Sequence, residues 1–119
     1  MNCYITNKFN NPIPFYLKIA DNDISRTVGL MYQSHLSKRN GMIFIYDYPK
    51  QYVGIWMKNT IIPLDVIFID EYNNIVDIKH GKPFDETVIY SNSFCKYIIE
   101  VPFNTCLSEG IEIGCKLIL

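Results

Sequence analysis

The segment that decides the fold is residues 55–70, which read Ile55-Trp56-Met57-Lys58-Asn59-Thr60-Ile61-Ile62-Pro63-Leu64-Asp65-Val66-Ile67-Phe68-Ile69-Asp70. From Leu64 to Ile69 both alternating faces are mainly apolar, which is typical of a central strand covered on both sides. Pro63 cannot donate to a neighbouring strand and so marks where this strand begins. We therefore expect a buried strand over residues 64–69, with Trp56 in or beside the core and a polar turn of Lys58, Asn59 and Thr60 held against it.

Shorter segments elsewhere have the apolar alternation of strands and are separated by Asn, Asp, Gly and Pro. We expect strands over residues 15–20, 42–46, 52–57, 75–78, 96–101 and 116–119, and short helices over about 23–31 and 105–109. Asn73-Asn74 predicts a hairpin after the central strand. Many short strands with one or two short helices predict a mainly β domain, either a compact β-sandwich of jelly-roll type or a barrel-like sheet.

The chain has 119 residues, which suits one domain with its own core. Residues 1–14 are polar and rich in Asn, and they end on Pro12 and Pro14. We expect these residues to form a lead-in segment with little helix or strand of its own. Residues 15–119 then form the single β-rich domain.

Composition excludes several functional classes. The net charge is -1 and no Lys/Arg cluster is present, so we expect no nucleic-acid partner. No apolar run is long enough for a transmembrane segment. The four cysteines have no C-x-x-C spacing, so neither a zinc ribbon nor a thioredoxin-type site is predicted. We expect buried thiols, with a Cys106–Cys115 disulfide as the alternative.

Asp65 is the most informative charged residue, because it shares its strand face with Ile67 and Ile69. A buried carboxylate needs a cation or several hydrogen-bond donors, and Arg26 and Lys58 are the cations we expect beside it. Such a cluster is either a structural ion pair or the lining of a polar pocket. The candidate ligand-binding residues are Arg26, Trp56, Lys58, Asn59, Thr60, Asp65 and Glu100.

No nucleophile with a base, carboxylate pair or metal set has a recognisable spacing. The leading hypothesis is a non-enzymatic module without a cofactor that binds an unknown small molecule or protein. One alternative is a small enzyme in which Asp65 or Glu100 is the general base. A further alternative is copper binding by Met31, Met42 and Met57, because thioethers favour Cu(I), although methionine is more often core filler.

Four motifs resemble those of one family, the small prokaryotic proteins of domain of unknown function 192. They are Arg26-Thr27-Val28-Gly29-Leu30-Met31, Gly41-Met42-Ile43-Phe44, Trp56-Met57-Lys58-Asn59-Thr60 with Pro63-Leu64-Asp65, and Ile99-Glu100-Val101-Pro102. The resemblance implies a compact β-rich, jelly-roll-type domain and no established activity. It also implies an extracytoplasmic protein, whereas the start of this chain lacks the apolar segment of a signal peptide, so a cytoplasmic location is the alternative expectation.

Overall fold

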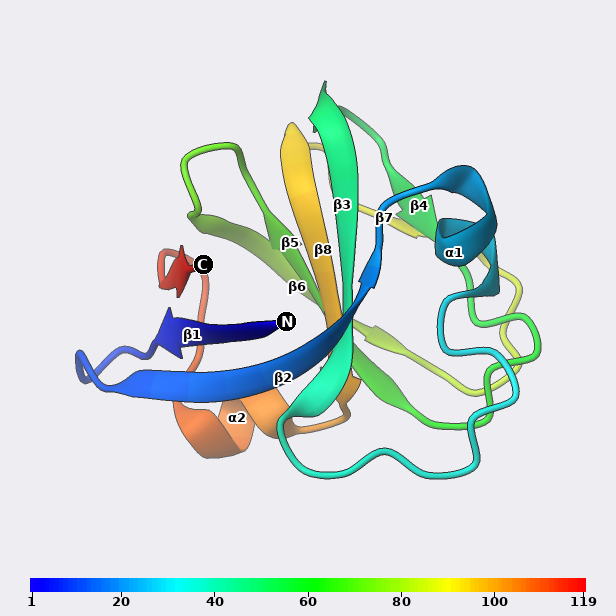
Figure 1. Cartoon of the computed structure of the whole chain (residues 1–119), viewed down its shortest axis with the longest axis horizontal. Helices are drawn as coiled ribbons and strands as arrows, with labels where there is room; N and C mark the ends of the chain where they lie inside the picture. Colours follow the sequence, from blue (N-terminus) through cyan, green and yellow to red (C-terminus); the bar gives the residue numbers. More distant parts are fainter.

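The computed structural model describes all 119 residues and is mainly β, with two short helices, as predicted. Figure 1 shows the elements in chain order. The strands are β1 (Asn2–Thr6), β2 (Pro12–Ala20), β3 (Asn40–Lys50), β4 (Gly54–Ile55), β5 (Leu64–Ile69), β6 (Ile75–Gly81), β7 (Ile89–Tyr90), β8 (Cys95–Pro102) and β9 (Lys116–Ile118). The helices are α1 (Asp23–Val28) and α2 (Thr105–Glu109). Neither helix is long and apolar enough to cross a membrane.

The predicted central strand is confirmed as β5. All of its residues are buried, and it pairs antiparallel with β6 on one side and β8 on the other. The seven-stranded sheet has the order β6-β5-β8-β3-β2-β1-β9, and β4 and β7 form a separate two-stranded ribbon. The strand predicted from the chain pattern is therefore second from the β6 edge of the sheet and is paired on both sides.

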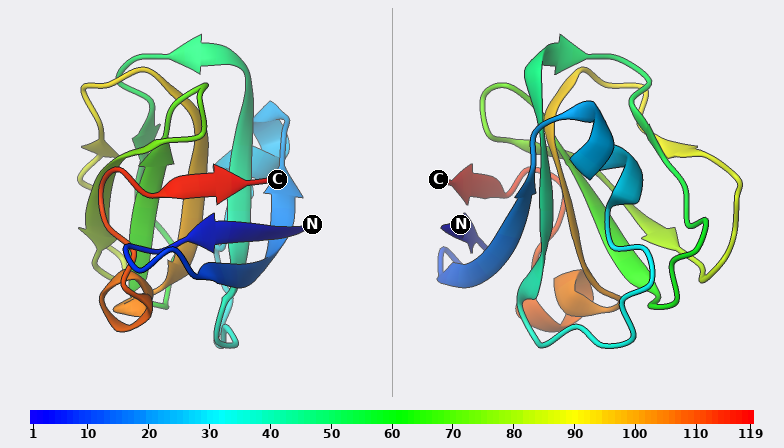
Figure 2. Two further views of the ribbon diagram at one scale, coloured as in Figure 1. Left: turned by 90° about the vertical axis from the view of Figure 1, so that its left-hand side faces the viewer. Right: turned by 45° about the vertical axis from the view of Figure 1, so that its right-hand side comes forward.

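The large sheet curls strongly, so the barrel-like form of the predicted fold describes it best. Figure 2 shows β1 and β9 side by side at one edge, with both chain ends near them. This edge approaches the start of β6 at the opposite edge, where Asn74 bridges Lys116. Leu117 N–H also donates to the Asn73 carbonyl at 2.8 Å. These contacts tie the two sheet edges together at one end of the curl.

The curled sheet has a separate hydrophobic core on each of its two faces. The inner core lies within the curl and includes Phe15, Ile43, Ile67, Ile69, Ile99 and Leu117 together with Cys106 from α2. The outer core lies between the other sheet face and the segments around α1 and β4, and it includes Leu30, Phe44, Tyr46, Ile55, Met57, Val66 and Phe68. Because successive β5 side chains alternate between these two cores, both of its faces had to be apolar.

The lead-in segment is not as expected, because residues 2–6 form β1. This strand pairs antiparallel with β2 and β9, and it buries Cys3 and Ile5 in the inner core. The alternation of these two apolar residues among polar ones was the overlooked signal. Further along, β3 extends beyond the expected strand 42–46 as far as Lys50, and only residues 54–55 of the expected strand 52–57 are in a strand.

The four cysteines are free and buried, as the first interpretation expected. Cys106 and Cys115 both lie in the inner core without forming the alternative disulfide. Burial raises the pKa of Cys3 and of Cys95 to about 11, and it raises the pKa of the Cys106 thiol further. Thiols held in their neutral form in this way are poor nucleophiles.

Candidate functional site

The Asp65 carboxylate is fully buried and is satisfied by three donors, none of which is Arg26 or Lys58. Oδ2 accepts the backbone N–H of Cys106 at 2.9 Å, and Oδ1 accepts that of Asn104 at 3.2 Å. His80 Nδ1 lies 2.9 Å from Oδ1. The expected pairing of Asp65 with Arg26 or Lys58 is therefore wrong. Side-chain alternation points Asp65 into the inner core and toward α2, whereas α1 covers the opposite face of the sheet.

Arg26 and Lys58 have other partners on the α1 side of the sheet. Arg26 Nη1 donates to the Ile45 carbonyl at 2.6 Å, and Nη2 lies 3.1 Å from Asp23 Oδ1. The Arg26 guanidinium also lies 5.0 Å from the centre of the Tyr46 ring. Lys58 lies over the Trp56 ring at 5.1 Å. Both cations therefore lie over aromatic rings, Arg26 also has local acceptors, and the predicted cluster around Asp65 does not form.

A pocket of about 410 Å³ opens on the side of the sheet covered by α1. Figure 1 shows the surrounding elements, with α1 beside β4. Its walls come from α1 and the turn after it, from β3 and from β4 with Trp56. It is lined by Asp23, Arg26, Thr27, Val28, Gly29, Leu30, Met31, Phe44, Tyr46, Gly54, Ile55, Trp56, Thr60 and Glu100. Half of these residues are apolar, and the polar ones include two acids and an arginine. Small-molecule sites usually combine apolar walls with a few placed polar groups in this way.

Glu100 is the unusual residue of this pocket. Its side chain projects from β8 on the outer-core face, and the residue is only 3% exposed. No hydrogen bond or ion pair satisfies the carboxyl group, yet no side-chain oxygen sealed from solvent lacks a partner. The Glu100 oxygens therefore reach the pocket. Desolvation raises the pKa of Glu100 to about 8, so the carboxyl is mainly protonated near neutral pH.

Two glycines allow Glu100 to lie where it does. Gly29 ends α1 with a φ of +50°, and a Cβ at this position would lie 3.9 Å from Glu100 Oε1 and 3.4 Å from the Phe44 ring. On β3, a Cβ on Gly41 would come within 1.9 Å of the Glu100 carbonyl oxygen. Gly29 therefore leaves room above the carboxyl group, and Gly41 permits the close approach of β3 to β8.

The polar turn after Trp56 is held mainly through its backbone. Asn59 has a φ of +55°, and its carbonyl accepts the N–H of Tyr32 at 2.8 Å. The Thr60 hydroxyl donates to the Lys58 carbonyl at 3.2 Å. Among the candidate ligand-binding residues, the structure thus brings Arg26, Trp56, Thr60 and Glu100 together around the pocket. Lys58, Asn59 and Asp65 do not line it.

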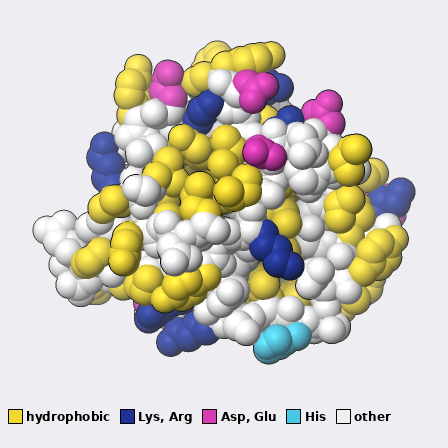
Figure 3. All heavy atoms as spheres, in the orientation of Figure 1, with side chains coloured by type: hydrophobic (Ala, Val, Ile, Leu, Met, Phe, Trp, Pro, Cys, Tyr) yellow, Lys and Arg dark blue, Asp and Glu magenta, His cyan; other side chains and the backbone are white.

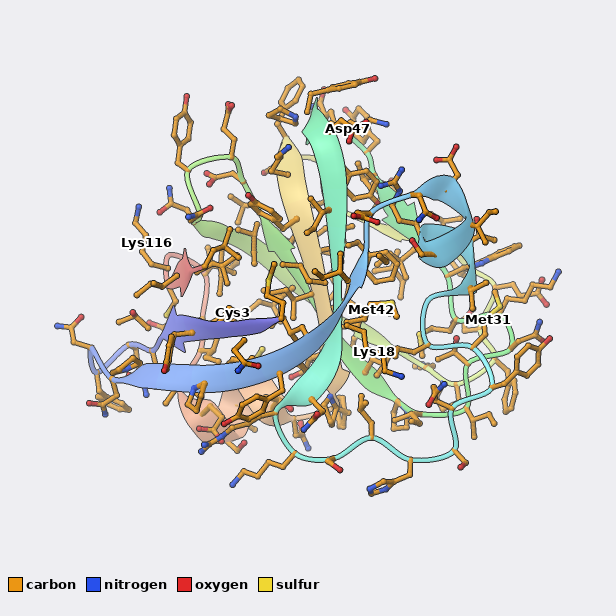
Figure 4. The ribbon with its side chains drawn as sticks, in the orientation of Figure 1. Cys3, Lys18, Met31, Met42, Asp47 and Lys116 are labelled. Carbon is orange, nitrogen blue, oxygen red and sulfur yellow. The ribbon has the colours of Figure 1, made fainter.

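The three methionines considered for copper come from different parts of the outer half of the molecule. Met31 lines the pocket. Met42 and Met57 are buried in the outer core, where they act as filler. Figure 4 shows Met31 on the segment after α1 and Met42 on β3. Only one thioether of the proposed set is therefore available to a ligand in the pocket.

Sequence reasoning missed several residues of the site. Phe44 and Tyr46 were expected in a strand, but their turn toward the pocket depends on how α1 packs over β3. His80 lies beyond the strand expected at residues 75–78, but the structure places it in β6, where it pairs with Asp65 and packs edge-on against Phe103. The register Asp65↔His80 between β5 and β6 creates this contact. The local sequence pattern does not predict the register between two strands.

Comparison with known proteins gives a match to the family model of DUF192, described as "Uncharacterized ACR", over residues 5–119. The chain belongs to this family. The resemblance of the four motifs is therefore confirmed. The match begins within β1, so the family domain includes most of the segment that we had expected to be a lead-in.

Relatives of this DUF192 member are described mainly as uncharacterised. A UPF0127 protein of Pyrococcus abyssi is 29% identical over 105 residues, which cover 85% of this chain and 83% of the relative. A protein of unknown function from Novosphingobium aromaticivorans is 27% identical with a TM-score of 0.94, over 100% of this chain and 84% of its own. A Sinorhizobium meliloti 1021 protein, provisionally described as a transcription regulator, has the same identity and TM-score, over 98% and 90%.

Proposed function

We propose that this protein is a small-molecule-binding module and that its site is the pocket between α1, β3 and β4 with Glu100 on its floor. The observation that carries the proposal is the Glu100 carboxyl group, which is buried, lacks a hydrogen-bond partner and reaches the pocket. Polar groups in such positions cost free energy unless something satisfies them. A bound ligand would supply the missing partner.

A purely structural role explains Glu100 poorly. Asp65, one strand away, shows how this fold satisfies a buried carboxylate, with two backbone donors and a histidine. Glu100 has no equivalent contacts, and an apolar side chain in its place would remove the desolvation cost. Buried titratable groups with perturbed pKa values in a cleft are characteristic of functional sites.

The test is a thermal-shift screen of a metabolite library on the wild-type protein, Glu100→Gln and Glu86→Gln. Glu86 is exposed and does not line the pocket, so its variant is the matched control. We expect at least one compound to raise the melting temperature of the wild type and of Glu86→Gln but not that of Glu100→Gln. If every stabilising compound acts equally on all three proteins, the pocket is not the site.

Proton transfer by Glu100 is a second candidate function, favoured by the position of its carboxyl group, which is buried and reaches the pocket. A pKa of about 8 suits a general acid or base at neutral pH. The other candidate base, Asp65, is sealed from solvent and cannot reach a substrate. Compounds that bind through Glu100 should then be converted on incubation with the wild type and remain unchanged with Glu100→Gln. Full recovery of every such compound from the wild type would leave binding alone as the function.

A further inference from the structure

The ligand class of this site can be argued from its charges, and this inference rests on the proposed function. We infer that the pocket binds a compact organic cation, with an ammonium group donating to the Glu100 carboxylate and an apolar body against the aromatic wall.

The cation of the pocket is already engaged, whereas its buried acid is not. Arg26 directs Nη1 to the Ile45 carbonyl and Nη2 to Asp23, and its guanidinium stacks on Tyr46. Glu100 is left without a donor. A charged donor satisfies a carboxylate about twice as strongly as a neutral one. An anionic ligand would instead place a second acid beside Glu100, with only the engaged Arg26 to offset it.

The walls favour an apolar or aromatic body on that cation. Phe44, Ile55 and Trp56 line the pocket together with Tyr46. Trp56 is 40% exposed at its rim, where its ring already attracts Lys58, and the Tyr46 ring attracts Arg26. These contacts show that the ring faces here are accessible to positive charge. A volume of about 410 Å³ limits the ligand to a small molecule.

Binding of a cation at Glu100 should release a proton, whereas binding of a neutral ligand should not. In the free protein Glu100 is mainly protonated at pH 7. An ammonium group beside it favours the ionised carboxylate, so the carboxyl proton leaves to solvent when the cation binds. The other titratable groups at the pocket are Asp23 and Arg26 from α1 and Tyr46 from β3. Burial raises the pKa of Tyr46 to about 12, so this phenol keeps its proton at pH 7.

The test compares three probes with similar bodies and different head groups: 2-phenylethylammonium, 2-phenylethanol and 3-phenylpropanoate. Isothermal titration calorimetry at pH 7, in buffers with different ionisation enthalpies, measures affinity and the number of protons exchanged. We expect the ammonium probe to bind about tenfold or more tightly than the alcohol. We also expect it to release up to one proton. Glu100→Gln should lower its affinity by a similar factor and abolish the release, whereas Glu86→Gln should match the wild type.

The outcomes separate this inference from the proposed function. Tighter binding of the alcohol or the carboxylate, or ammonium binding without proton release, overturns the cation assignment. So does failure of all three probes when library compounds of other kinds still bind through Glu100, and the proposed function then stands. If no compound distinguishes the wild type from Glu100→Gln, both proposals fail. Proton release is measured on the wild type, so the cation assignment remains testable even if Glu100→Gln does not fold.

Discussion

The Asp65 carboxylate of β5 and the backbone N–H of Cys106 in α2 form a 2.9 Å hydrogen bond that links the central strand to the second helix. Asn104, which immediately precedes the helix, makes no side-chain bond to it and has a φ of +69°. A strand side chain thus satisfies N–H groups at the start of α2 that would otherwise be unpaired. The Asp65 carboxylate also holds the His80 ring at the surface, where that ring packs against Phe103.

Asp65→Asn should destabilise the protein by about 1.5 to 3 kcal/mol, because an amide cannot accept from all three donors. Part of the Asn side chain would present a donor to a backbone N–H. Urea unfolding followed by fluorescence measures the change in the free energy of unfolding. Asp47→Asn is the matched control, since the Asp47 carboxyl is exposed and makes no hydrogen bond (Figure 4). Equal stabilities for the two variants would contradict the capping role.

Stability should fall as the pH rises from about 5 to 9 because of Glu100. Its pKa in the folded protein, about 8, is above the ordinary value of 4.5, so the folded state holds this proton more tightly than the unfolded state does. The contribution of this bound proton to the free energy of unfolding is complete below pH 4.5 and is lost as the pH rises through 8. Its full size is on the order of 5 kcal/mol.

Chemical denaturation at several pH values, on the wild type and Glu100→Gln, checks this prediction. Glu100→Gln should lack this pH-dependent loss of stability. Its free energy of unfolding should therefore rise relative to that of the wild type as the pH increases. Parallel pH profiles for the two proteins would show that Glu100 ionises freely in the folded state.

Phe68→Ala should cost about 3 to 5 kcal/mol, the usual cost of emptying an aromatic core site. Phe68 is fully buried in the outer core on β5, as the sequence predicted. Phe94→Ala is the control, because that ring is exposed. Thermal and urea unfolding provide the comparison, and a loss below about 1 kcal/mol for Phe68→Ala would mean that the site refills or is not packed as described.

Gly41→Ala should destabilise the protein by at least about 2 kcal/mol, because the added methyl group would overlap the backbone of β8. Its Cβ would lie 1.9 Å from the Glu100 carbonyl oxygen, which cannot move without disturbing the β3–β8 pairing. Differential scanning calorimetry measures the loss. An unchanged melting temperature would show that β3 and β8 are farther apart at this point.

Surface charge gives no simple guide to partners. Figure 3 shows positive and negative side chains interspersed with apolar ones on the face seen in Figure 1. The net charge of -1 agrees with this mixture. Long-range attraction of a charged partner is therefore a weaker basis for function here than the local chemistry of the pocket.

The sequence by itself determined the mainly β class, the central strand at residues 64–69 and the family, because these depend on local alternation and on motifs carried along the chain. It also marked Arg26, Trp56, Thr60 and Glu100, which meet around one pocket. Local pattern missed β1, whose pairing partners lie in β2 and in β9 at the far end of the chain.

Only the tertiary structure decided which charged groups meet. Asp65 in β5 and Glu100 in β8 are both acids among apolar neighbours, so their sequence environments look alike. The sheet places Asp65 in the inner core, where α2 and His80 supply its donors. Glu100 faces the outer side, where Gly29 and α1 leave a pocket and no donor forms a hydrogen bond with its carboxyl group. Side-chain parity and strand register fix this difference, and both are set by pairings between distant segments rather than by neighbours in sequence.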